Sequence, residues 1–366
     1  MAKKDKKIRN PRLGTVGGQA VLEGVMMKGK DRYAVAVRLE DGSIKMTEDV
    51  FVSVRKKHKI LDIPVLRGIV NMVEMFVLSY KTLGISADAM GLDNLEPETK
   101  FERWLNDKLG KNIVNVIMVI ASVLGVALGL FLFTFLPTVS AKGVDLLAGG
   151  SLGWVKNLIE GLIKIGIFVA YLALVSLMPD IRRTFEYHGA EHKSIFCYES
   201  GEELTPVNVK KHTRFHPRCG TSFLFVMLLL SILIFSLPFV PWDNALLRVA
   251  IKLALLPLIV GIGYEFIRFA GKHDNIIVRI LSAPGLWMQR ITTREPSEDQ
   301  IECAIAALKT ALNVEFPDFD VSVYDRGVKA EADTPTQKPE SEPAVESAQK
   351  PPAEESEAEP QTQPDA

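Results

Sequence analysis

Three residues in the stretch TFEYHGAEHKSIFCYE, residues 184–199, have the types and spacing of a metal site. His188 and His192 are four residues apart, so on a helix they share one face and their imidazoles can converge on one ion. Glu191 lies three residues after His188, close enough to orient or deprotonate a water on that ion. The H-x-x-E-H pattern follows the logic of zinc peptidases with two histidine ligands and a glutamate base. It predicts Zn²⁺ as the cofactor and Glu191 as the catalytic residue.

A catalytic zinc needs a third protein ligand as well as an open position for water. His216 and Cys219 lie in the stretch HPRCGTSF at H-x-x-C spacing, just before an apolar segment. Glu265 lies inside another apolar segment, where a carboxylate without a partner is costly. It follows His192 by about seventy residues, roughly where that peptidase class places its third ligand. The expected metal ligands are therefore His188 and His192, completed by His216, Cys219 or Glu265. A structural zinc site is the alternative.

Two features limit this expectation. Gly189 lies inside the motif and weakens a helix by about 1 kcal/mol relative to alanine, so His188 is expected in the first helical turn. The neighbouring His212 is expected to be solvated, and His273 is expected to lie at the membrane interface.

A second stretch, VGGQAVLEGVMMKG, begins at residue 16 and contains several glycines. It matches neither G-x-x-x-x-G-K-[ST] nor G-x-G-x-x-G, so no phosphate loop is predicted. The simpler interpretation is a strand entered through a tight turn at Gly17 and Gly18. The sharper one places Gln19 and Glu23 at the membrane surface, bonded to arginines of the histidine region or to the metal site.

Long apolar segments must position these residues. Four of them have the length of a transmembrane helix, which needs about 20 residues: 113–137, 158–178, 222–240 and 246–270. The segment 61–90 is also largely apolar, but Arg67, Asn71 and Glu74 form one polar stripe along it. This stripe favours an interfacial or re-entrant helix over a full span.

The fold class predicted is an α-helical polytopic membrane protein with about four transmembrane helices, one interfacial or re-entrant helix and a small N-terminal β-rich segment. In that β-rich segment, Asp41-Gly42 between alternating stretches predicts a hairpin. Ser297 before Glu298 to Gln300 predicts a capped amphipathic helix. The remaining segments are a basic arm (1–13), the β-rich cytoplasmic domain (14–60), a cytoplasmic His/Cys loop (179–220), cytoplasmic amphipathic helices (271–327) and a disordered acidic tail (328–366).

Lysines and arginines gather on one expected side of the membrane. The loop 179–220, the segment after residue 270 and the N-terminal arm are basic, whereas the opposite loops contain Lys142 and Lys156. The positive-inside rule therefore predicts that both termini and the histidine loop are cytoplasmic. The formal net charge of −1 divides into −7 for the tail 328–366 and +6 for the rest. A moderately basic body suits contact with membrane lipids, and no nucleic-acid partner is expected.

Long motifs in the chain resemble the YqhQ-like family of bacterial membrane proteins. They are GGQAVLEGVMM (17–27), FEYHGAEHK (185–193), HPRCGTSF (216–223), YEFIR (264–268) and QIECAIAALK (300–309). The resemblance covers residues from about 14 to 312. It implies a multi-pass protein of the bacterial cytoplasmic (inner) membrane, with a domain of unknown function often labelled a predicted metal-dependent enzyme.

Together these features predict a metal-dependent membrane hydrolase with its site on the cytoplasmic face, acting on peptide or lipid-linked substrates. The alternative is a membrane scaffold or assembly factor without enzymatic activity, whose His/Cys loop is held by structural metal or by hydrogen bonds. Its sheet domain and acidic tail are expected to recruit protein partners. A transporter is less favoured, because the clearest intramembrane charges are Lys252 and Glu265 and no repeat of broken helices is present.

Overall fold

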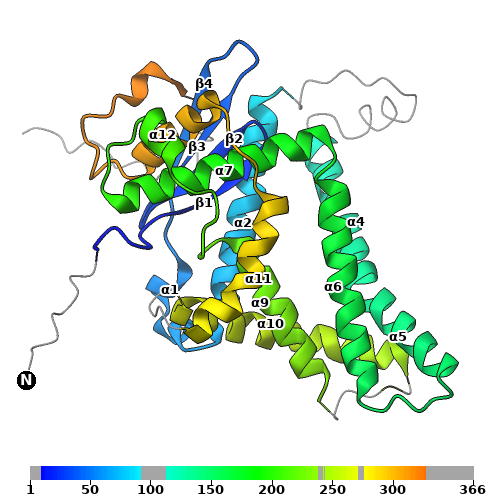
Figure 1. Ribbon diagram of the computed structural model, residues 1–366. Helices are drawn as coiled ribbons and strands as arrows, with labels where there is room; N and C mark the ends of the chain where they lie inside the picture. The colour runs from blue at the N-terminus through cyan, green and yellow to red at the C-terminus, as the bar shows by residue number, and fades with distance from the viewer. Residues whose placement is uncertain (1–9, 92–112, 238–241, 243, 271–275, 327–366) are drawn as a thin grey trace, which may run out of the picture. The chain divides into compact units, whose positions relative to one another are not determined.

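The computed structural model describes residues 10–91, 113–237, 242, 244–270 and 276–326 (Figure 1). The predicted acidic tail, most of the basic arm and His273 lie outside these residues. The principal helices are α2 (Leu66–Ala89), α4 (Ile113–Leu130), η4 (Phe131–Phe135), α5 (Leu136–Leu147), α6 (Val155–Val175), α7 (Pro179–Ser200), α8 (Pro206–Lys211), α9 (Gly220–Phe235), α10 (Ala245–Ala270), α11 (Ile276–Thr292) and α12 (Glu298–Ala311). Short helices are α1 (Val54–Lys57), η1 (Lys59–Asp62) and η5 (Val321–Val323).

The predicted N-terminal sheet is present. Its strands are β1 (Gly17–Val21), β2 (Gly24–Lys28), β3 (Arg32–Arg38) and β4 (Ile44–Val50), which pair antiparallel in chain order. The β3–β4 hairpin turns at Asp41-Gly42 as expected, and Gly42 has a φ of +85°, which glycine adopts without strain. A short β5 (Asp325–Arg326), which the sequence analysis did not predict, pairs parallel to β4.

Both faces of this sheet are buried, because successive side chains of a strand point to opposite sides. On β3, Ala34 and Ala36 belong to a core shared with α7 and α12. The alternating residues Tyr33 and Val35 belong to a second core with Leu78 of α2. Figure 1 shows α7 and α12 beside the strands. The small β-rich segment is therefore the centre of a three-layer arrangement, built from both ends of the described chain.

Helix α2 joins the sheet to a membrane helix. Its Arg67 forms an ion pair with Glu265 of α10, and a Cβ at Gly68 would come within 2.7 Å of Tyr264. At Glu74 the carboxylate accepts hydrogen bonds from Ser53 Oγ and the Val54 backbone at 2.7–2.9 Å. Arg67 and Glu74 of the predicted polar stripe therefore bond other groups of the protein rather than water alone.

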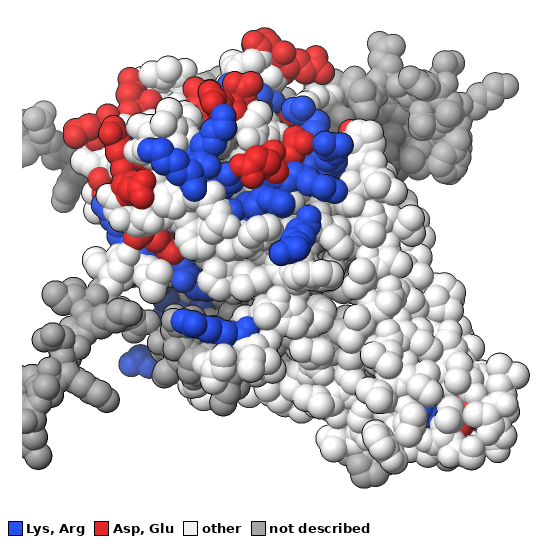
Figure 2. Space-filling view, in the orientation of Figure 1, with Lys and Arg blue, Asp and Glu red and all other residues white. Residues whose placement is uncertain are grey.

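Three helical segments are long and apolar enough to cross a membrane: Val119–Leu147, Val155–Val175 and Leu246–Phe269. These segments indicate a membrane protein. The fourth expected span, 222–240, corresponds to α9, which is apolar but has 16 residues. Such a helix rises roughly 24 Å, less than a hydrocarbon core of about 30 Å. Figure 2 shows Lys, Arg, Asp and Glu gathered over α7, α12 and the sheet, whereas the surfaces of α4, α5 and α6 are almost free of charge in this view.

Candidate metal centre

The H-x-x-E-H motif lies on a long helix rather than in a loop. The segment 179–220 was expected to be a loop, but α7 fills its first half. Pro179 provides a preorganised first turn, and Gly201, with a φ of +77°, ends the helix in the left-handed conformation. His188 is ten residues into this helix, so the expectation that it lies in the first turn is wrong.

Gly189 explains that difference. A Cβ at Gly189 would lie 2.0 Å from the backbone oxygen of Arg294, so the segment after α11 crosses the helix at a point where a side chain does not fit. The Arg294 N–H also donates to the Phe185 backbone oxygen at 2.8 Å. The glycine therefore serves close packing in the middle of α7, which its helix propensity alone does not reveal.

Three ligand atoms converge beside α7. His188, His192 and Cys219 each offer one ligand atom, and these atoms all lie within 4.8 Å of one another. The His188 Nε2 to Cys219 Sγ distance is 3.2 Å. Tetrahedral zinc ligands with bond lengths of about 2.0–2.3 Å are roughly 3.4–3.6 Å apart. The spacing is therefore close to that of a zinc site with three protein ligands.

Backbone carbonyls orient both imidazoles for this role. His188 Nδ1 lies 2.8 Å from the Thr292 oxygen, and His192 Nδ1 lies 2.5 Å from the Arg214 oxygen. A carbonyl oxygen accepts and cannot donate, so Nδ1 carries the proton in each ring. In the neutral rings both Nε2 lone pairs are then free to bind an ion. Metal-ligating histidines are commonly fixed by such second hydrogen bonds.

Cys219 differs electrostatically from the other two cysteines. Burial alone would raise the pKa of its thiol, but interactions with the His192 imidazole and with the hydroxyl and backbone N–H of Thr221 bring that pKa below its ordinary value. Burial raises the pKa of Cys197 to about 11 and that of Cys303 to about 12. Because metals bind thiolates, Cys219 is the cysteine suited to be a ligand.

Glu191 completes the cluster as a buried carboxyl group. Its Oε2 lies 3.9 Å from His188 Nε2 and has no hydrogen-bond partner among the described residues. Burial raises its pKa to about 8, while the backbone N–H of Gly18 favours the ionised form. An unpaired buried oxygen is rare in proteins and calls for an ion, a proton or a water.

The position of Gly18 shows what the N-terminal glycines do. Gly17 and Gly18 lie within β1 rather than in a turn before it. A Cβ at Gly18 would come within 3.0 Å of Glu191 Cγ and 2.6 Å of the Met26 backbone oxygen. The strand therefore approaches the motif more closely than a larger residue would permit.

His216 lies next to the cluster but is used elsewhere. Its ring centroid is 5.4 Å from that of His192. Its Nδ1 accepts the Arg218 backbone N–H at 3.3 Å, and its Nε2 lies 4.0 Å from Glu199. Burial lowers the pKa of this imidazole. The structure does not bring His216 into the group of ligand atoms.

Glu265, the other candidate third ligand, lies against α2. Its carboxylate forms a two-pronged ion pair with Arg67, with 2.6 Å between Arg67 Nε and Glu265 Oε1. The Val65 N–H adds a weaker contact at 3.4 Å. A carboxylate in an apolar segment needs a partner, and Arg67 supplies it. The ligand group of His188, His192 and Cys219 does not include Glu265.

Replacing Glu265 is therefore expected to affect stability but not metal content. Glu265→Gln removes the charge partner of Arg67, which is expected to destabilise the fold by about 1–3 kcal/mol. Metal analysis and thermal unfolding in detergent measure the two effects separately. A loss of metal from a folded Glu265→Gln protein would contradict this assignment.

Glu23 makes the bond to an arginine of the histidine region that the sharper interpretation of the N-terminal stretch expects. It lies in the β1–β2 turn with a φ of +46°, an unusual conformation for glutamate. Arg183 of α7 donates two hydrogen bonds of 2.5 Å to its carboxylate. Gln19 instead bonds Ser79 and Thr82 of α2, with a Thr82 distance of 2.7 Å. The N-terminal sheet is thus fastened to the helix that carries the candidate ligands.

Several residues that position the site escaped the sequence analysis. Gln289 of α11 accepts the His216 N–H at 2.7 Å and donates to the His216 backbone oxygen at 2.8 Å and to Ser222 Oγ at 2.9 Å. Thr292 and Arg214 act through their carbonyls, which carry no signature in the sequence. A second group, Cys197, Glu202 and His212, has donor atoms close together. The raised pKa of Cys197 makes that group a poorer metal site.

Comparisons with known proteins identify the family of the chain. A family model described as "Protein of unknown function (DUF1385)" matches residues 63–314. The chain is 38% identical over 304 residues to "Uncharacterized protein YqhQ" of Bacillus subtilis (strain 168), covering 82% of this chain and 92% of that protein. No solved structure matches.

Proposed function

Because the chain belongs to the DUF1385 family, described as proteins of unknown function, we propose its function from its own site: a metal-dependent hydrolase of the membrane. The observation that carries the proposal is one arrangement. Two histidines and a cysteine of lowered pKa present ligand atoms within 4.8 Å of one another, beside a buried carboxyl oxygen that has no hydrogen-bond partner among the described residues.

The residues fit Zn²⁺ in number and chemistry. His188, His192 and Cys219 would hold the ion through two imidazole nitrogens and one thiolate, a donor set typical of zinc. Three protein ligands leave a fourth position, as in catalytic sites. When bound, zinc supplies Lewis acidity and lowers the pKa of a water molecule.

Glu191 is the proposed proton carrier. Its Oε2 lies on the His188 side of the cluster, at 3.9 Å from Nε2, and makes no competing hydrogen bond within the described chain. The buried carboxyl group can hold a proton near neutral pH, because burial raises its pKa to about 8. A nearby cation lowers that pKa, so the group is suited to accept and return one proton during hydrolysis.

We place the site on the cytoplasmic face of a bacterial inner membrane, with both termini on that side and four spans, counting α9. The distribution of lysine and arginine supports this orientation. For a site at this face of the membrane, peptide or lipid-linked molecules are the natural substrate classes. His188 is the most accessible member of the cluster, with 15% of its side chain exposed against 6% for Glu191. The substrate is therefore expected to approach from the His188 side.

Glu191→Gln tests the proposal. Zinc-loaded protein in detergent is assayed against chromogenic esters, peptides and phosphodiesters, and wild type is compared with the variant. The variant is expected to retain zinc and to lose activity by about 10²–10⁴-fold, the usual contribution of a general base. An active Glu191→Gln protein with full zinc would remove Glu191 from the mechanism.

The burial of the cluster favours a second candidate, a scaffold whose metal is structural. Counted over the whole residue, His192 is 1% exposed and Glu191 is 5% exposed, as in closed structural sites. A scaffold would retain zinc and fold, show no hydrolysis on any substrate, and tolerate Glu191→Gln in cells.

A further inference from the structure

The membrane helices contain a second polar cluster, which shares no residue with the metal centre. Glu160 of α6 is buried and accepts hydrogen bonds from Arg248 at 2.7 Å, from Thr138 at 2.7 Å and from Lys252. Lys252 also donates to Thr138 at 2.8 Å. One carboxylate is therefore shared between two cations of α10.

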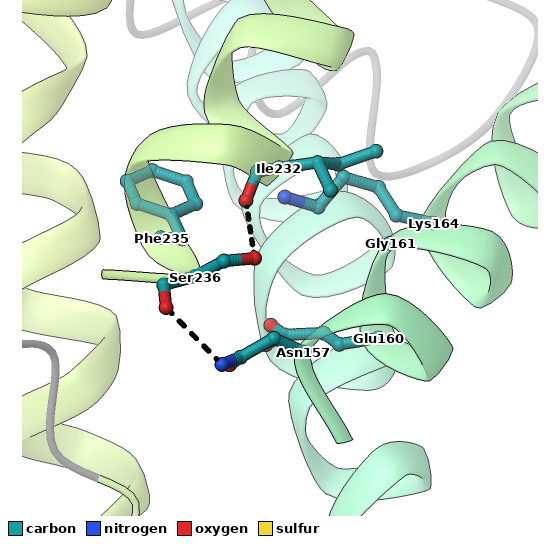
Figure 3. A pocket seen from close by; sticks show the side chains of 7 residues that line it. All are labelled: Asn157, Glu160, Gly161, Lys164, Ile232, Phe235 and Ser236. Atoms are coloured by element: carbon teal, nitrogen blue, oxygen red, sulfur yellow. Dashed lines mark hydrogen bonds between the residues drawn. The ribbon is translucent and has the colours of Figure 1, made fainter. Parts of the chain in front are cut away.

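Lys164, one helical turn after Glu160, differs from these two cations. Its side chain is buried, with 7% of the residue exposed. Its contacts are Ser231 Oγ at 3.5 Å and the Phe235 ring, whose centroid is 5.0 Å from Nζ. No carboxylate among the described residues pairs with Lys164. Figure 3 shows Lys164 and Glu160 on α6, opposite Ile232, Phe235 and Ser236.

This unpaired cation lies deep in a span. Lys164 is the tenth residue of the 21-residue α6, roughly 14 Å from the helix start. A charge at that depth is costly, and such residues normally pair with another charge or line a functional cavity. Asp145, another acid of the described membrane helices, already pairs with Lys156 at 2.6 Å.

A cavity lies beside these cations. Its volume is about 200 Å³, and the polar part of its lining comes from Thr134, Lys164, Ser231 and Lys252. The remainder is mostly apolar and includes Phe168, Leu228 and Leu256. An apolar cavity of about 150 Å³ already accommodates benzene. The Phe235 ring lies 5.0 Å from Lys164 Nζ and 5.5 Å from Lys252 Nζ, so both ammonium groups approach one end of the cavity.

We propose that this cavity binds one anionic amphiphile, a molecule with a phosphate or carboxylate head and an alkyl tail. The head bridges Lys164 and Lys252, and the tail lies along Phe168, Leu228 and Leu256. The anion supplies the negative charge that Lys164 lacks as a partner among the described residues, and the apolar lining selects a molecule from the lipid phase. The site does not depend on the metal centre or on hydrolytic activity.

Binding of dodecyl phosphate tests the proposal by native mass spectrometry of the full chain in a neutral maltoside detergent. Wild type is expected to bind one dodecyl phosphate saturably. Lys164→Met is expected to weaken binding by about tenfold or more, because a charge-assisted hydrogen bond is lost. Lys142→Met removes the same charge from α5 outside the cavity lining and is expected to bind as wild type. Zinc content, unchanged in all of these proteins, separates this result from the fate of the proposed hydrolase.

Two further probes separate head from tail. Dodecanol, which has the tail alone, and inorganic phosphate, which has the head alone, are both expected to compete at least about tenfold more weakly than dodecyl phosphate. If either probe competes as well as dodecyl phosphate, the proposal of an amphiphilic ligand is wrong.

If Lys164→Met does not fold, Leu256→Trp tests whether the probe binds in this cavity. It fills the cavity and retains every cation, so it is expected to exclude the probe. Wild-type affinity in either folded variant would overturn the proposal.

Discussion

About one zinc ion per chain is expected in protein purified in mild detergent without a polyhistidine tag. Cys219→Ser is expected to lose this zinc, because it replaces the one thiol whose pKa the site lowers. His188→Ala and His192→Ala remove the other two ligands of the cluster. Removal of an outer-shell partner typically weakens metal affinity by about 10–100-fold, and removal of a direct ligand is expected to weaken it by more than that. Elemental analysis together with a zinc-chelator competition measures both stoichiometry and affinity.

Cys197→Ser is the matched control for this experiment. Cys197 is also buried and lies in α7, but burial raises its pKa to about 11. Its removal is therefore expected to leave zinc in place. His216→Ala separates the neighbour from the ligands, because His216 is expected to affect affinity less than His188 or His192. Wild-type protein that is folded but without stoichiometric metal would contradict both the hydrolase and the structural-metal scaffold, and would favour a scaffold whose His/Cys region is held by hydrogen bonds alone.

Gly189→Ala is expected to have the largest effect on stability of any single methyl group added to α7. The new Cβ would lie 2.0 Å from the Arg294 oxygen, and this neighbour is backbone that cannot rotate away. A destabilisation of about 1–3 kcal/mol or more is expected, as for overpacked cores. Zinc binding should weaken as well, since the displaced segment begins near Thr292, whose carbonyl orients His188. Thermal unfolding and zinc affinity are measured on the same samples.

Gly166→Ala on α6 is the matched control. A Cβ there has no described atom within 4 Å, so alanine is expected to be neutral or to stabilise the helix by up to about 1 kcal/mol. If Gly189→Ala unfolds at the wild-type temperature and keeps its zinc, the close crossing of α7 by the 294–296 segment is not a feature of the protein.

The elements with local signals could be predicted from the sequence. The Asp41-Gly42 turn forms the β3–β4 hairpin, and Ser297 with Gln300 forms a capping box at the start of α12. The four-residue spacing of His188 and His192 also suffices to predict that their rings meet once a helix forms. Each of these inferences depends on residues that are close in the chain.

The choice of third ligand could not be made in this way. Cys219, His216 and Glu265 all have suitable chemistry, and their separation depends on which helix packs beside α7. The need of Glu265 for a partner was evident from its apolar surroundings, but the sequence does not reveal that Arg67 of α2 meets it. The carbonyls of Thr292 and Arg214 are backbone groups that any residue could offer, so only the fold identifies them as anchors of the imidazoles.

The burial of both sheet faces has a consequence for synthesis of the chain. Strands β1 to β4 are translated first, but α12, which covers one face, follows about 250 residues later, after every apolar span has been made. At about 5–20 residues per second this interval lasts roughly 12–50 s. Helix α7, which packs on the same face, is made during that time, but the part of the face that α12 covers has no permanent cover while the spans enter the bilayer. Insertion of the spans is therefore expected to precede closure of the soluble core, and a chaperone that shields the nascent sheet should increase the yield of folded protein.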